Sequence, residues 1–144
     1  MEVITLLPAH AAIVDAVCLM TVIDGVLEQE EIAFLEAMIT TMLSVDLDIA
    51  QALIQNSLGR LGDEDTEHFV EEIVARLTEP ADRHACMVAL QLASLADGIG
   101  AEIEVAMLDD FSQRLALSKE EIHEAIGAAR QLHATVGRAL EARD

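Results

Sequence analysis

The sequence predicts an all-α fold, a single compact bundle of about seven helices over residues 1–144, with two related halves around central apolar helices. Three observations support this prediction. The chain is 53 % apolar but only 2 % aromatic, so its core must consist of Leu, Ile, Val, Met and Ala, which suit helices better than strands. No stretch alternates as a half-buried strand would. An internal repeat at an offset of 73 residues relates the two halves.

The two predicted central helices cover residues 9–23 and 81–96. Both are apolar on almost every side, and a helix without a polar face belongs inside a bundle. Asp15 interrupts the first of them. We expect its side chain to face outward or to lie at the rim, because an unpaired buried carboxylate is costly. If it faces inward, it requires a partner.

The other predicted helices cover residues 28–43, 46–58, 65–77, 101–116 and 118–141. Gly59 or Gly62 is expected to end the third helix, and an Asp within 63–67 to cap the fourth. Pro80 suits the first turn of the fifth helix. Ser118 and Glu121 form a capping box at the start of the last one.

The repeat halves are about 9–62 and 79–142, and matched residues fall where the helices are expected. The pairs are Ala12/Ala85, Ala16/Ala89, Leu19/Leu92, Asp24/Asp97, Gly25/Gly98, Glu31/Glu104, Leu35/Leu108, Ile49/Ile122 and Ala52/Ala125. The helix at 65–77 then connects two related halves.

The charge balance is strongly acidic, with 27 acidic against 8 basic residues and a net charge of −19. Such a surface repels phosphate, so nucleic acid and anionic membranes are expected to be poor partners. Cations and basic protein surfaces fit better. A second interpretation is a solvated face that keeps an apolar-rich domain soluble. The high apolar fraction also favours a self-association face and hence a homodimer.

The chain is expected to be soluble and cytoplasmic. Residues 3–23 are mostly apolar, but Glu2 replaces the basic start of a signal peptide, and Asp15 argues against a membrane span. Cys18 and Cys86 lie in apolar helical runs, which predicts two buried, reduced thiols rather than a disulfide framework.

Each half contains the motif Asp-Gly-x5-Glu, with the carboxylates Asp24 and Glu31 in the first and Asp97 and Glu104 in the second. One interpretation is a turn followed by a helix start, with Glu accepting from free backbone amides. The other is a cation site shared by all four carboxylates, preferring Ca²⁺, Mg²⁺ or Mn²⁺ to zinc. A shared site is impossible if the two turns lie at opposite ends of the bundle.

An EF-hand is excluded by the residues at the first and third loop positions. These would be Met20 and Val22 in one copy and Ala93 and Leu95 in the other, and none of them can ligate calcium. The sequence is expected to contain no zinc-binding spacing, phosphate-binding Gly loop or nucleophile elbow.

Two predicted apolar helices each end in Asp-Gly, and the second half contains the stretches ADGIGAEIEVAMLDDF and LALSKEEI. In these features the chain resembles the TerB-like family of tellurite-resistance proteins. The first half departs from the pattern in two places. It has IDG in place of ADG, and it has Val45 at the position that corresponds to the capping residue Ser118 of the second half. The resemblance implies a compact bundle of about seven helices. It also implies an acidic module, with a divalent metal in some cases, in stress and tellurite-resistance systems that are partly membrane-associated. It implies no catalytic reaction.

The function expected from these observations is a non-enzymatic acidic adaptor that binds a basic or membrane-associated protein partner. The alternative is a divalent-cation sensor that uses Asp24, Glu31, Asp97 and Glu104 as ligands. A third option, a carboxylate-based metal hydrolase, would require acidic or His residues that converge on one interior pocket.

Overall fold

The computed structural model describes residues 8–22, 28–96 and 102–143 and confirms the all-α bundle. These residues form seven helices and no strand. The helices are α1 (Pro8–Val22), α2 (Gln29–Leu43), α3 (Leu47–Asp63), α4 (Thr66–Arg76), α5 (Pro80–Ala96), α6 (Glu102–Arg114) and α7 (Lys119–Arg143). No helix in this part of the chain is long and apolar enough to cross a membrane.

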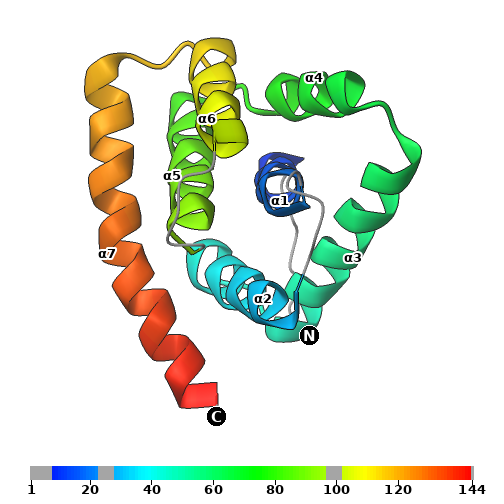
Figure 1. Cartoon of the computed structure of the whole chain (residues 1–144), viewed down its shortest axis with the longest axis vertical. Helices are drawn as coiled ribbons and strands as arrows, with labels where there is room; N and C mark the ends of the chain where they lie inside the picture. The colour runs from blue at the N-terminus through cyan, green and yellow to red at the C-terminus, as the bar shows by residue number, and fades with distance from the viewer. Residues whose placement is uncertain (1–7, 23–27, 97–101, 144) are drawn as a thin grey trace.

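Helix α1 is the centre of the molecule. Figure 1 shows it nearly end-on, with α2, α3, α4 and α5 around it, and it packs against all four. Ten of its 15 residues are buried, on every side of the helix. The prediction of a central helix without a polar face is therefore confirmed for α1.

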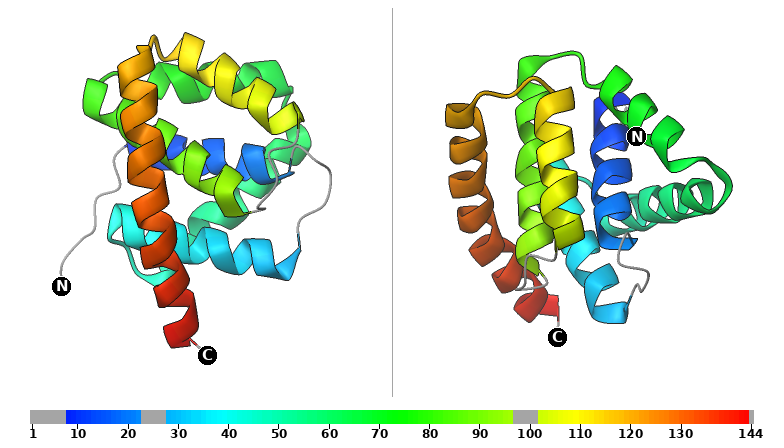
Figure 2. Two further views of the ribbon diagram at one scale, coloured as in Figure 1. Left: turned by 60° about the vertical axis from the view of Figure 1, so that its left-hand side comes forward. Right: turned by 45° about the horizontal axis from the view of Figure 1, so that its top comes forward.

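Helix α5 is the second central helix and packs against α1, α2, α6 and α7. Its residues 86–90 are buried without interruption, as are Leu92 and Ala93. The long helix α7 covers α5 from outside (Figure 2) and also reaches α2. At that contact the rings of Phe34 and His133 lie 5.8 Å apart. The predicted packing of the two apolar helices against each other is confirmed.

Local capping signals were read correctly from the sequence. Ser118 N–H donates to Glu121 Oε1 over 3.2 Å, and Glu121 N–H donates to Ser118 Oγ over 3.1 Å, which completes the predicted capping box. Asp65 caps α4, since its Oδ2 accepts from the backbone N–H of His68 over 3.3 Å. Pro80 starts α5 as expected.

Of the two predicted ends of the third helix, Gly59 was wrong, whereas Gly62 lies within one residue of the observed end. Helix α3 continues past Leu58 and through Gly59 and Gly62 to Asp63. A Gly inside a helix costs only about 1 kcal/mol relative to Ala, which tertiary contacts readily offset. Here Arg60, which lies between the two glycines, forms an ion pair with Asp15 of α1. This contact ties the last turns of α3 to the centre of the bundle.

The helix order follows the repeat, but burial does not follow it throughout. Helices α1, α2 and α3 start at residues 8, 29 and 47, and α5, α6 and α7 start at 80, 102 and 119, within one residue of the 73-residue offset. In the third pair the register fails, because Ala52 is exposed whereas Ala125 is buried. The internal repeat itself stays a prediction.

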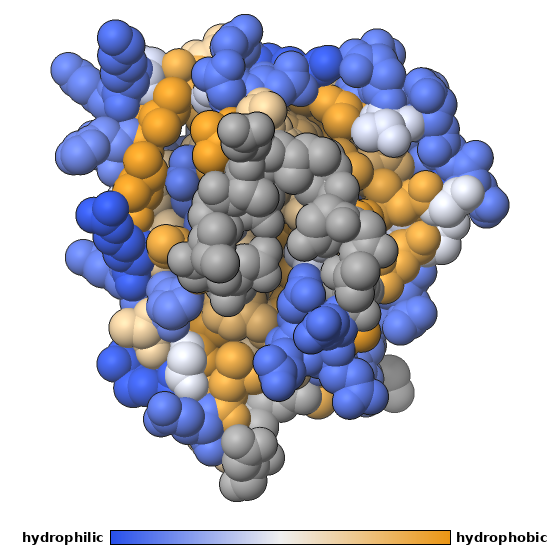
Figure 3. Space-filling view, in the orientation of Figure 1, coloured by the Kyte–Doolittle hydropathy of each residue, from blue (hydrophilic) through white to orange (hydrophobic). Residues whose placement is uncertain are grey.

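The apolar surface is divided into small areas. On the face drawn in Figure 3, apolar side chains form narrow strips beside hydrophilic ones. Among the described residues, the large apolar side chains that are exposed are Leu47, Leu95 and Val105, which belong to three different helices. The predicted self-association through an apolar face stays a prediction.

Candidate functional site

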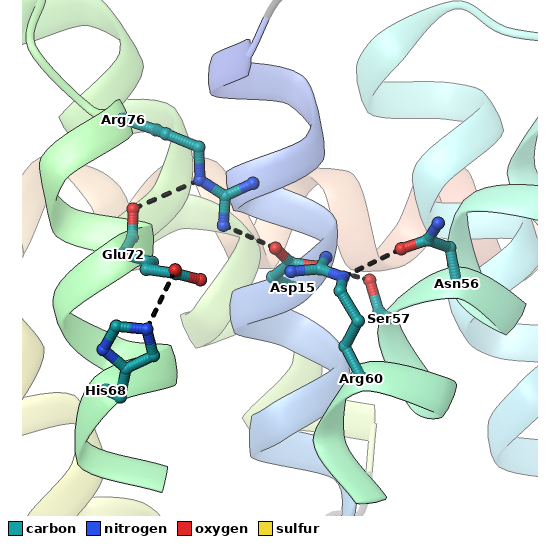
Figure 4. Close-up of polar contacts among 7 residues, drawn as sticks. All are labelled: Asp15, Asn56, Ser57, Arg60, His68, Glu72 and Arg76. Atoms are coloured by element: carbon teal, nitrogen blue, oxygen red, sulfur yellow. Dashed lines mark hydrogen bonds and ion pairs between the residues drawn. The ribbon is translucent and has the colours of Figure 1, made fainter. Parts of the chain in front are cut away.

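The carboxylate of Asp15 is buried in the middle of the bundle, with a side chain that is only 1 % exposed. The expectation that it faces outward or lies at the rim was wrong. Its Oδ1 accepts hydrogen bonds from Ser57 Oγ, over 2.5 Å, and from Arg60 Nη2. Its Oδ2 accepts from Arg76 Nη2 over 2.5 Å. The inward orientation is possible because α3 and α4 both supply donors (Figure 4).

The partners of Asp15 reach it because of their positions on two helices. Ser57 and Arg60 are three residues apart and therefore lie on one face of α3. Arg76 lies in the last turn of α4, and both helices pack against α1. The arginine side chains are 34 % and 27 % exposed, so each guanidinium spans from solvent to the buried carboxylate.

The electrostatics favour an ionised Asp15. Burial alone would raise the pKa of this carboxyl, but the hydrogen bonds from Arg60, Ser57 and Arg76 outweigh burial and hold the pKa below its ordinary value. The hydrogen bond to Asp15 likewise raises the pKa of Arg60. The three groups therefore form a permanent ion cluster at neutral pH.

The two thiols are buried and free, as predicted. Burial raises the pKa of Cys18 to about 12, and the nearby charge of Asp15 contributes to the rise. Burial alone raises the pKa of Cys86 to about 12. Since the thiolate is the reactive form, neither cysteine is suited to act as a nucleophile.

A cavity of about 500 Å³ opens between α1 and α3 beside the Asp15 cluster. Its lining is Ala11, Asp15, Asp48, Ile49, Ala52, Leu53, Asn56, Ser57 and Arg60. The polar groups of this wall bind one another, since Arg60 Nε donates to Asn56 Oδ1 over 2.9 Å and Ser57 donates to Asp15. A carboxyl with a lowered pKa is a weak base, so the arrangement suits a structural ion cluster better than proton transfer.

A second group of polar side chains lies near the same two arginines. Glu64 directly follows α3, and His68 and Glu72 lie on α4 (Figure 4 shows the latter two). One ligand atom from each of the three lies within 4.8 Å of the others, and His68 Nε2 is 3.0 Å from Glu72 Oε1. Among the described residues, this is the group of His, Cys, Asp and Glu side chains that converges closely enough to hold a metal ion.

The four predicted cation ligands are placed only in part. Asp24 and Asp97 lie outside the described residues. Glu31 lies in the first turn of α2, as expected, and Glu104 belongs to α6. The shared carboxylate site stays a prediction, to be tested by a Ca²⁺ titration of the variant Asp97→Asn with Glu104→Gln.

No family model, no curated protein and no solved structure matches the chain. The TerB-like resemblance therefore rests on the sequence motifs quoted above.

The sequence analysis missed both polar groups, although each left a signal. A lone carboxylate in an apolar helix requires cationic partners, and Arg60 and Arg76 are the first two basic residues of the chain. His68 and Glu72 are four residues apart on α4, which brings their side chains together, whereas Glu64 precedes this helix in the turn after α3.

Proposed function

We propose that the chain is a non-enzymatic acidic helical module of the TerB-like type, which docks onto a basic surface of a protein partner in a stress-response or tellurite-resistance system. The support comes from the distribution of charge. Residues 1–118 contain 22 acidic and 4 basic residues, whereas residues 119–144 contain 5 acidic and 4 basic ones. Nearly all of the net charge of −19 therefore belongs to the part of the chain before α7.

The four arginines before α7 are all engaged within the molecule, and this single observation carries the proposal. Arg60 and Arg76 bind Asp15. Arg114 binds Asp110 over 2.8 Å and Glu67 over 2.7 Å. Arg83 Nε donates to the carbonyl oxygen of Leu77 over 2.7 Å, at the end of α4.

Apart from Arg114, which pairs with Glu67 of α4, none of these arginines forms an ion pair with the exposed carboxylates in and beside α2, α3 and α4 within the described residues. Glu28, Glu30, Asp46, Asp48, Asp63, Glu71 and Glu79 are all exposed. A concentration of one sign of charge steers a complementary partner and disfavours partners of the same sign. The surface thus fits a basic protein face better than a nucleic acid or an anionic membrane.

Two variants with equal net charge test the proposal. The first carries Glu28→Lys, Asp48→Lys and Glu71→Lys, and the control carries Glu120→Lys, Glu124→Lys and Glu141→Lys on α7. Three reversals add six charges in either case, so both variants change from −19 to −13. All six carboxylates are exposed, and the fold should tolerate either set.

The measurement is a quantitative pull-down from cell extract at two salt concentrations. The first variant should lose basic partners that the wild type and the α7 variant retain, and higher salt should weaken capture. Equal capture by both variants would contradict the proposal, because it would show that the local acidic surface does not select the partner.

A further inference from the structure

We propose that Glu64, His68 and Glu72 form a binding site for a first-row divalent transition ion, with Zn²⁺ as the preferred occupant. This site is distinct from the four carboxylates predicted from the sequence. It does not depend on the proposed docking function, since it requires no protein partner.

The geometry of the three side chains fits a small ion. Their ligand atoms lie within 4.8 Å of one another. Two ligands on a tetrahedral zinc ion with bonds of about 2.1 Å are roughly 3.4 Å apart, so closure requires only a modest approach. His68 and Glu72 are 60 % and 43 % exposed, and such side chains change rotamer without disturbing the core.

Glu64 supplies an independent observation. Its Oε2 atom is buried, and no hydrogen-bond partner reaches it among the described residues. A buried acceptor without a partner costs about 1–3 kcal/mol, and more when it is charged. A bound cation at the position shared with His68 and Glu72 would remove this cost.

The neighbouring arginines leave the two glutamates available. Arg60 and Arg76 direct their guanidinium groups to Asp15. The one bond from these arginines to Glu72 goes to its backbone carbonyl, from Arg76 Nε over 3.2 Å. Within the described part of the chain, neither arginine donates to the carboxylate of Glu64 or Glu72, so both retain free lone pairs for an ion.

The local charge also suits a divalent cation. Asp15, Glu64 and Glu72 carry three negative charges beside the two positive charges of Arg60 and Arg76. With neutral His68 the neighbourhood holds one excess negative charge. A divalent ion would change the local sum only from −1 to +1.

The donor set determines the class of metal. One imidazole nitrogen with two carboxylates is typical of zinc and its neighbours, whereas Ca²⁺ and Mg²⁺ prefer oxygen ligands alone. Three protein ligands leave a fourth tetrahedral position for water or for a group of another molecule. The competing interpretation is a plain His–Glu pair at i,i+4 spacing, and the experiment distinguishes the two.

The test is a titration of the full chain with Zn²⁺ alone, followed by calorimetry and by NMR of the histidine rings. We expect one equivalent to bind, with the His68 ring resonances changing and those of the other four histidines unchanged. Glu64→Gln, His68→Gln and Glu72→Gln should each weaken binding by at least about tenfold. An equal concentration of Ca²⁺ should not compete.

His123→Gln is the matched control, because His123 is also exposed and lies between Glu120 and Glu124 on α7. It should bind Zn²⁺ as the wild type does. The proposal is overturned if the wild type shows no saturable binding, if ring shifts spread over all histidines, or if the three variants bind undiminished. The location of the shifts in the wild type decides the question even if a variant folds poorly.

Discussion

Helices α1 and α5 both lie at the centre of the bundle, yet the bundle packs around them by different means. At the 73-residue offset Asp15 of α1 corresponds to Val88 of α5, which is 4 % exposed. Ser57 and Arg60 of α3 correspond to Arg130 and His133 of α7, and both of these are exposed. One central helix therefore carries a buried ion cluster where the other carries an ordinary apolar side chain.

The difference shows what a buried charge adds to an apolar bundle. Apolar contacts are non-directional, so α7 packs on α5 without a fixed angular requirement. Asp15 must receive its donors at hydrogen-bond distance, which fixes α3 and α4 relative to α1. A buried ion cluster is weak evidence for added stability, and we attribute to this one the selection of a single helix arrangement.

The largest effect is expected from placing a carboxylate in α5. Val88→Asp would bury a charge with no arginine directed to it, and we expect a loss of about 4 kcal/mol or more in the free energy of unfolding. Urea denaturation followed by circular dichroism measures this loss. Val88→Ala is the control for lost volume. A smaller loss for Asp than for Ala would mean that α5 tolerates charge as α1 does.

Removing the charge from α1 is expected to have the next largest effect. Asp15→Asn should cost about 3 kcal/mol, since it leaves two guanidinium groups without their buried counter-charge. The combined change Asp15→Val, Arg60→Met and Arg76→Leu replaces the ion cluster by apolar side chains, as at Val88 of α5. It should recover most of the lost free energy of unfolding. If the triple variant is less stable than Asp15→Asn in urea, the equivalence of the two helices is disproved.

The pH dependence of stability should follow Asp15. Its pKa is lower in the folded protein than in the unfolded chain, so the contribution is complete above the unfolded value and decreases as pH falls through the folded value. Wild-type stability should therefore fall below about pH 4, and Asp15→Asn should show a shallower decline. Urea midpoints measured across this range would reveal identical slopes if Asp15 titrates normally.

The smallest effect is expected from replacing a glycine in α3 or in α7. A methyl group added at Gly59 in α3 or at Gly127 in α7 would meet no atom within 4 Å. Both Gly59→Ala and Gly127→Ala should therefore stabilise by about 0.5–1 kcal/mol through helix propensity. Thermal unfolding measures the gain. Loss of stability in α3 alone would show that its end is constrained in a way that α7 is not.

The sequence predicted what depends on local pattern. Apolar periodicity located seven helices, and the capping box at Ser118 was readable because its partners are three residues apart. The orientation of Asp15 was not predictable in this way, because its donors follow it by 42 to 61 residues. The same contacts explain why α3 continues past Gly59. Of the candidate sites, only the four-residue spacing of His68 and Glu72 on α4 was accessible to local reasoning.

The position of α7 gives the molecule an electric dipole moment. Figure 1 and the right-hand view of Figure 2 show this helix on one flank and α3 on the opposite flank. The flank formed by α7 is nearly neutral, while the remainder carries the acidic excess. In the field of a positively charged body the protein would rotate before contact and present α3 and α4 first. Two copies of the chain would repel least with their α7 flanks facing each other.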